Sequence, residues 1–203
     1  MREIFICGQK LLVTDEEGNL IGSDQNLISR HWTPKPGDVC VDAGFGPGTW
    51  TLIALARGAT TFSFDPKENA TDILKRHIEL NGFKLATVIQ MGLWNAAAML
   101  PFGANGFKEK EMSFERPCTT LDLHFSEHPV ERVDYINMDV EGSEMNVLFG
   151  ARKTLRRHLP KLIIEVHDMA EWDGLEEEIA AAGPYTFLRE NNFLIAEPRK
   201  KGD

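Results

Sequence analysis

The chain has 203 residues, of which 42% are hydrophobic and 26% charged, and a formal net charge of −9. This composition predicts one globular domain with a full core, and the acidic balance argues against a nucleic-acid backbone or an anionic membrane as the main partner. The three cysteines form no C-x-x-C pair, which gives no support to a zinc knuckle and fits a reducing compartment. We find neither the apolar stretch of a signal peptide nor an apolar run near the roughly 20 residues that span a bilayer, so we expect a cytoplasmic protein.

The first part of the chain is predicted to form a small β extension that acts as a lid or an edge. Short strands are expected within 4–13, a turn at 15–19 and a short helix over 24–30. A Pro-Lys-Pro-Gly stretch then breaks the chain. We therefore divide the chain into an N-terminal extension, residues 1–37, and a main domain, residues 38–198.

A glycine-rich turn follows the first buried strand. The strand ends in Asp42, the glycines follow at 44, 46 and 48, and a helical stretch covers 51–56. Strand, glycine turn and helix N-terminus together form a cofactor cradle, because glycines admit close backbone approach and free N–H groups favour negative charge. The spacing D-x-G-x-G-x-G differs from the G-x-G-x-x-G of dinucleotide folds. The carboxylate of Asp42 would repel a pyrophosphate but suits a cationic amino-acid group such as that of S-adenosylmethionine. A glycine turn without a ligand is the alternative.

Strands and helices alternate through the main domain. The expected strands are 39–42, 60–64, 86–91, 133–138, 162–166 and a closing hairpin of 185–188 with 193–196. The expected helices are 51–56, 66–80, 143–159 with an interruption near Gly150, and 171–182. This alternation predicts an α/β fold with a mostly parallel seven-stranded sheet, a C-terminal antiparallel hairpin and helices on both faces.

The stretch from residue 92 to residue 123 interrupts the alternation. Residues 94–100 fit either a strand or a short helix, 102–107 are a turn-rich tip, and 108–115 are charged. Residues 119–123 have the pattern of a buried edge followed by a loop. No acceptor motif is readable here or in the N-terminal extension, where we expect the loops of an acceptor pocket.

Four of the expected strands end in polar residues: Asp42, Asp65, Asp139, and the pair Glu165 and His167. Open α/β sheets bind ligands beyond the carboxyl ends of their strands. Asp65 is placed to accept hydrogen bonds from ribose hydroxyls, or to cap the next helix. Asp139 is a candidate to orient a substrate, take its proton or hold a divalent metal. His167 is a candidate general base near neutral pH, or with Glu165 a cap of a loop.

Two further acids follow Asp139 in the chain. Asp139 and Glu141 bracket a turn, and Glu144 comes next to it. For Glu144 we favour a simpler role, in which its charge stabilises a helix N-terminus through the helix dipole.

Several segments of the chain resemble the FkbM-type methyltransferases. They are Asp65-Pro66, Thr119-Thr120-Leu121-Asp122, Asp139-Val140-Glu141-Gly142-Ser143-Glu144, Leu148-Phe149-Gly150-Ala151, and Pro160-Lys161-Leu162-Ile163-Ile164-Glu165-Val166-His167, within residues 38–168. The resemblance implies a Rossmann-like methyltransferase sandwich, S-adenosylmethionine as cofactor and O-methylation of a small-molecule or sugar hydroxyl. With it, the candidate cofactor-binding residues are Asp42, Gly44, Phe45, Gly46, Gly48, Asp65, Leu93, Asp139 and Glu141. The candidate catalytic residues are Asp139, Glu165 and His167.

The chain departs from that family at three positions. The family usually has Asn where Gly46 stands, Lys where Asn137 stands and often Glu where Asp65 stands. Two alternative functions stay open, a nicotinamide-dependent oxidoreductase on a similar sheet and a non-catalytic nucleotide-binding module. A divalent metal held by Asp139 with Glu165 or His167 is open as well, without a metal motif to support it.

Overall fold

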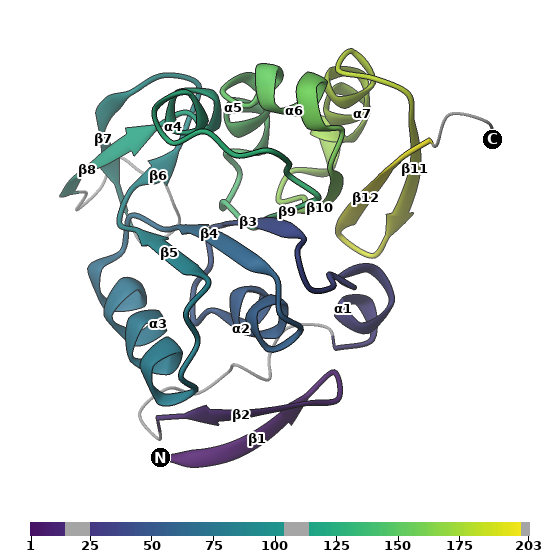
Figure 1. Cartoon of the computed structure of the whole chain (residues 1–203). Coiled ribbons are helices and arrows are strands. Elements are labelled where there is room, and N and C mark those ends of the chain that lie inside the picture. The colour runs from purple at the N-terminus through teal and green to yellow at the C-terminus, as the bar shows by residue number, and fades with distance from the viewer. Residues whose placement is uncertain (15–24, 104–113, 200–203) are drawn as a thin grey trace.

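A seven-stranded sheet forms the centre of the protein in the computed structural model, which describes residues 1–14, 25–103 and 114–199 (Figure 1). Its strands are β3 (Val39–Ala43), β4 (Thr60–Phe64), β5 (Ala86–Ile89), β9 (Tyr135–Met138), β10 (Lys161–Glu165), β11 (Tyr185–Glu190) and β12 (Phe193–Pro198). The order across the sheet is β11-β12-β10-β9-β3-β4-β5. Only β12 runs opposite to the other six strands, so the predicted mostly parallel sheet with a closing hairpin is confirmed.

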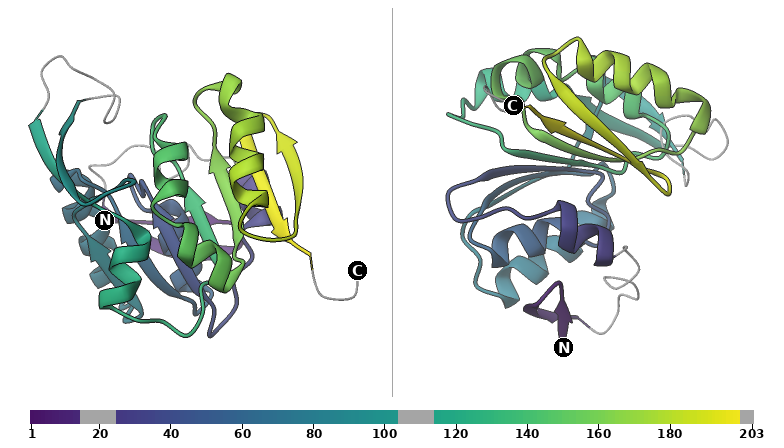
Figure 2. Two further views of the ribbon diagram at one scale, coloured as in Figure 1. Left: turned by 90° about the horizontal axis from the view of Figure 1, so that it is seen from above. Right: turned by 90° about the vertical axis from the view of Figure 1, so that its right-hand side faces the viewer.

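Helices cover both faces of this sheet (Figure 2). One face carries α1 (Gln25–His31), α2 (Thr49–Ala56) and α3 (Glu68–Leu80), and the other α4 (Leu121–Glu127), α5 (Glu144–Phe149), α6 (Arg152–His158), a 3-10 turn (Met169–Glu171) and α7 (Trp172–Ala180). Each face has its own apolar cluster, and the alternation along β3 sends Cys40 into one and Val41 into the other. None of the helices among the described residues has both the length and the apolar character needed to cross a membrane.

The N-terminal strands form a hairpin outside the helices of one face. β1 (Arg2–Ile6) and β2 (Gln9–Val13) pair antiparallel through a turn at Cys7 and Gly8, both with positive φ, as a tight hairpin requires. Asn81, at the end of α3, holds β2 by accepting from the Leu12 N–H at 2.8 Å and donating to the Leu12 carbonyl at 2.8 Å. The expected strands are therefore present, and the boundary at residue 37 stays a prediction. The expected turn at 15–19 and the start of the helix expected from Asp24 lie outside the described residues.

A separate small sheet occupies the stretch that interrupts the alternation. Its strands are β6 (Gly92–Leu93), β7 (Ala98–Phe102) and β8 (Phe114–Thr119), in the order β6-β8-β7. Most of the turn-rich tip and of the charged segment, residues 104–113, lies outside the described residues. The buried edge and loop expected over residues 119–123 are wrong beyond Thr119, where β8 ends, because α4 begins at Leu121. Thr120 caps that helix by accepting a hydrogen bond from the Leu123 N–H at 2.9 Å.

Candidate cofactor and acceptor site

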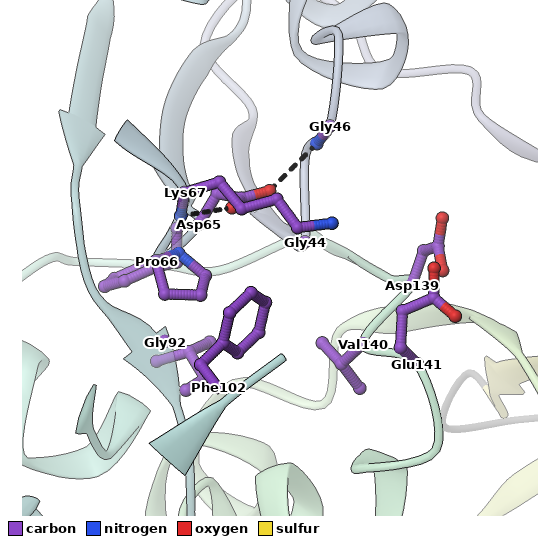
Figure 3. A pocket seen from close by; sticks show the side chains of 12 residues that line it. Gly44, Gly46, Asp65, Pro66, Lys67, Gly92, Phe102, Asp139, Val140 and Glu141 are labelled. Carbon is purple, nitrogen blue, oxygen red and sulfur yellow. Dashed lines mark hydrogen bonds between the residues drawn. The ribbon is translucent and has the colours of Figure 1, made fainter. Parts of the chain in front are cut away.

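The glycine turn after β3 borders a cavity at the carboxyl ends of the strands (Figure 3). Gly44, Gly46 and Gly48 all have positive φ, at 77°, 50° and 92°. A Cβ on Gly44 would lie 1.7 Å from the Asp139 carbonyl oxygen, and one on Gly48 would lie 2.5 Å from the Leu74 side chain. A Cβ on Gly46 would meet nothing within 4 Å. Gly44 is thus required by packing against the Asp139 backbone and Gly48 by its left-handed conformation, whereas Gly46 leaves open space at the edge of the cavity.

Asp65 closes the cradle from the end of β4. One carboxylate oxygen accepts the Gly46 N–H at 3.1 Å and the other accepts the Lys67 N–H at 2.8 Å. The side chain is buried, and this burial raises its pKa, while the two N–H groups oppose the shift. Because α3 begins only at Glu68, Asp65 shapes the turn before the helix and does not cap the helix itself. Each oxygen keeps a further lone pair for a ligand hydroxyl.

Six of the nine candidate cofactor residues line this cavity. The full lining is Gly44, Gly46, Phe64, Asp65, Pro66, Lys67, Gly92, Leu93, Phe102, Asp139, Val140 and Glu141. Asp65 lies on one side of it and the acids Asp139 and Glu141 on the other, and the ring of Phe102 lies below Asp65 in the view of Figure 3. Sequence reasoning missed Phe102, because it fell in the irregular stretch, and Lys67, because its place follows from the turn that Asp65 builds.

Asp42 does not reach the cavity. Its side chain is 1% exposed and lies beneath the glycine turn. One oxygen accepts the Thr51 N–H at 3.0 Å and the Thr51 hydroxyl at 2.6 Å, and the other accepts the Asn137 amide at 2.9 Å. Burial raises the Asp42 pKa to about 6, against these hydrogen bonds. We expected this carboxylate to face a cationic ligand group. It instead ties β3 to the start of α2 and to β9.

Two other candidates also point away from the cavity. Phe45 is buried in the apolar cluster beneath α2 and α3, and Gly48 packs against Leu74. Both residues shape the turn, and other residues of the turn contact the cavity.

The acids at the end of β9 gather around His167. The imidazole Nδ1 lies 2.7 Å from the Glu144 carboxylate, and Nε2 lies 3.6 Å from an Asp139 oxygen and 3.4 Å from a Glu141 oxygen. Glu144 is fully buried and also accepts the Gly142 N–H at 3.0 Å. Glu144 stands in the first turn of α5, where the dipole role that we favoured requires it to be. Its shortest hydrogen bond, however, is to a histidine 23 residues further along the chain, which that role did not include.

These contacts set the electrostatics of the cluster. The hydrogen bond to Glu144, with Asp139 and Glu141 nearby, raises the pKa of His167 to about 9 against the effect of burial. Burial first, and then the charge of Glu165, raises the pKa of Asp139 to about 7, while His167 lowers it.

Glu165 is set apart from the other catalytic candidates. Its carboxylate accepts the Asn192 amide at 2.7 Å, across the antiparallel pairing of β10 with β12, and it does not line the cavity. The structure thus gathers Asp139 and His167 and leaves Glu165 to act on Asp139 through its charge alone.

Several solved structures share the fold of this chain. The chain is similar in structure to methyltransferase FkbM from Methylobacillus flagellatus KT, with a TM-score of 0.62 and 20% identity, over 85% of this chain and 52% of that one. It therefore spans about half of that protein's length. It is also similar to an rRNA methylase from Streptococcus thermophilus, with a TM-score of 0.55 and 17% identity, over 92% of this chain and 100% of the other.

A third similar structure is a 16S rRNA methyltransferase from T. thermophilus in complex with AdoMet and guanosine. Its TM-score is 0.57 and its identity 15%, over 98% of this chain and 50% of that one. At such identities these structures show the fold alone. No curated protein matches the chain significantly. The sequence profile of the methyltransferase FkbM domain matches residues 50–195, and the chain therefore belongs to the FkbM methyltransferase domain family.

Proposed function

We propose that this protein is an S-adenosylmethionine-dependent methyltransferase that methylates a hydroxyl oxygen of a small molecule or sugar. The proposal depends on one observation, the hydrogen bond between the Gly46 N–H and Asp65 at the carboxyl ends of β3 and β4. Gly46 leaves open space, and Asp65, which its N–H holds in place, offers free lone pairs beside that space. This is where open α/β sheets bind nucleotides.

The residues of the cavity fit that cofactor. Asp65 suits the hydroxyls of a ribose, since a carboxylate accepts two such hydrogen bonds. Leu93 and Phe102 give the same end of the cavity an apolar and aromatic surface that suits a purine ring. Lys67 and Pro66 complete this wall.

The opposite end of the cavity suits the acceptor. S-adenosylmethionine supplies an activated methyl group, so the protein's task is to place the acceptor oxygen in line with it and to remove the proton of the hydroxyl. Asp139 lines this end, and Nε2 of His167 lies 3.6 Å from the Asp139 carboxylate. These two side chains are the groups we assign to the acceptor, with Asp139 in contact with it.

The other functions are weaker fits. A nicotinamide-dependent oxidoreductase would need a pyrophosphate in the turn, which lacks the G-x-G-x-x-G spacing. A non-catalytic binding module would not need Asp139 at the cavity wall. The rRNA methylases that share the fold make RNA an acceptor to test, although the net charge of −9 disfavours it.

Two measurements test the proposal. Calorimetric titration with S-adenosylmethionine, S-adenosylhomocysteine and NAD should show binding of the two sulfur nucleotides and none of NAD. Methyl transfer should then be assayed against hydroxylated metabolites, sugars and a structured RNA. Folded protein that binds neither sulfur nucleotide would refute the cofactor, and methylation of RNA alone would refute the acceptor class.

A further inference from the structure

We infer that Asp139, Glu141 and His167 bind one divalent first-row metal ion at the acceptor end of the cavity. Each residue offers one ligating atom, and these atoms all lie within 4.8 Å of one another. The two carboxylates come from the turn after β9, and the imidazole comes from the residues that follow β10. The three side chains are at least partly exposed, so that an ion can reach them from solution.

The two distances from the imidazole to the carboxylates are those of ligands around one ion. His167 Nε2 lies 3.6 Å from Asp139 Oδ1 and 3.4 Å from Glu141 Oε2. Charge-assisted hydrogen bonds between such groups are shorter, at about 2.7–2.9 Å. A tetrahedral ion with bonds of about 2.1 Å places its ligand atoms about 3.4 Å apart. Both distances therefore fit two ligands of one ion better than two hydrogen bonds.

A buried carboxylate behind His167 is an independent sign of a metal site. His167 Nδ1 lies 2.7 Å from Glu144, which is fully buried and also accepts the Gly142 N–H. Histidine ligands usually donate their second ring N–H to such a carboxylate, which fixes the tautomer and the orientation of the ring. With Nδ1 donating to Glu144, Nε2 faces the space that it shares with Asp139 and Glu141, and an ion bound there takes the place of the Nε2 proton.

The charges of the cluster favour a cation. Three carboxylates, those of Asp139, Glu141 and Glu144, surround a single imidazole, and a divalent ion offsets two of the three negative charges. One nitrogen and two carboxylate oxygens suit Zn²⁺ or Mn²⁺, whereas Mg²⁺ prefers oxygen ligands alone. The competing arrangement is an imidazolium that bridges the carboxylates without an ion.

A role for the ion in the reaction rests on the proposed methyl transfer. Three protein ligands leave a coordination position open, as in catalytic zinc sites, and an acceptor oxygen bound there loses its proton more readily. As the new bond between oxygen and methyl forms, the bond between sulfur and methyl breaks, and the sulfonium becomes a neutral thioether. Asp139 then serves as a metal ligand, and the proton of the hydroxyl passes to solvent.

The site can be tested without cofactor or acceptor. Chelator-treated protein is titrated with Zn²⁺ by calorimetry and with Mn²⁺ by electron paramagnetic resonance, and we expect one saturable ion per chain. His167→Asn keeps a donor at the Nδ1 position and removes Nε2, so it should weaken binding at least 100-fold, as should Asp139→Asn. Glu144→Gln should weaken it 10- to 100-fold. Glu177→Gln, which removes an exposed carboxylate from α7, should bind as the wild type does.

Two outcomes would overturn the inference. One is the lack of a saturable site in folded wild-type protein, which would favour the bridging imidazolium. The other is unchanged affinity in His167→Asn and Asp139→Asn, with folding checked by circular dichroism. Binding of S-adenosylhomocysteine to the metal-free protein is measured in parallel. It tests the proposed function separately, since the Gly46 and Asp65 end of the cavity needs no ion.

Discussion

Replacing Gly46 by alanine tests the cradle with a single methyl group. The new Cβ would meet no protein atom within 4 Å, so the methyl enters the space that we assign to the cofactor. Its cost to folding comes from the backbone alone, because Gly46 has a φ of 50° and a left-handed residue other than glycine costs about 1–2 kcal/mol. For a chain of this size that lowers the melting temperature by about 2–8 °C.

The effect on binding should be larger than this backbone cost suggests. We expect Gly46→Ala to lose at least tenfold in affinity for S-adenosylhomocysteine, which is about 1.4 kcal/mol or more. Gly82→Ala is the matched control. Gly82 has a φ of 68° and equally open surroundings, but it follows α3 outside the cavity. It should lose similar stability and keep its affinity.

The assay combines calorimetric titration of S-adenosylhomocysteine with thermal unfolding of the wild type and both variants. A third variant calibrates the steric argument. In Gly44→Ala the Cβ would lie 1.7 Å from the Asp139 carbonyl oxygen, so the backbone must move, and strain and overpacking together cost about 2–5 kcal/mol. Wild-type affinity in Gly46→Ala would show that the cofactor does not pass over Gly46 and would refute the reasoning.

Four further substitutions separate binding, chemistry and folding. Asp65→Ala should weaken S-adenosylhomocysteine binding more than tenfold, and an unchanged dissociation constant would leave Asp65 only a structural part of the turn. Asp139→Asn should keep cofactor affinity within a few-fold and abolish turnover, so full activity would remove Asp139 from the mechanism. Burial raises the pKa of Asp42 from 3.8 to about 6, so between pH 4 and 6 the native state keeps a proton that the unfolded chain loses. The resulting contribution to stability, about 3 kcal/mol, is present below pH 4 and lost by pH 6. Urea unfolding should therefore show that the free energy of unfolding of the wild type falls between pH 4 and 6 relative to that of Asp42→Asn. Parallel curves of unfolding free energy against pH would contradict this. Asp122→Ala removes the carboxylate that accepts three hydrogen bonds from the first turn of α6, and should cost about 1–2 kcal/mol of unfolding free energy while leaving cofactor affinity unchanged.

The sheet and the meeting of its polar ends could be predicted from the sequence. Parallel strands place their carboxyl ends at one edge, so the glycine turn, Asp65 and Asp139 had to approach one another once the alternation of strands and helices was recognised. The family resemblance and the α/β fold are both confirmed. These features depend on local periodicity and on topology, which a single sequence carries.

The orientation of individual carboxylates could not be predicted in the same way. Asp42 lies beneath the turn because Thr51 and Asn137 donate to it, and Asn137 stands 95 residues away in the chain. Glu144 likewise meets His167 only through the pairing of β9 with β10. At a strand end, the side chain turns toward whichever partners the neighbouring elements supply. That choice is made by tertiary packing, not by local pattern.

The failure to predict the helix after Thr120 is a different kind of error, because the sequence contains a signal for that helix. Thr120 precedes Leu121, and its hydroxyl accepts the N–H three residues later, as a capping residue does. The pairing of β8 with both β6 and β7 is nonlocal and hid this pattern within an irregular stretch. Thr120 and Asp122 of this segment thus both act as helix caps, one for α4 and one for α6.

The departure at Asn137 connects the electrostatics of the cradle with those of the acceptor end. The family usually has a lysine there, and such a side chain beside Asp42 would hold the pKa of that carboxylate down by its charge. Asn137 supplies a hydrogen bond but no charge, so burial is free to raise the Asp42 pKa to about 6. The same substitution leaves the end of β9 without that cation, beside Asp139 and Glu141. His167 lies within 3.6 Å of both carboxylates, and its two distances to them favour a bound ion as a further source of positive charge at this end.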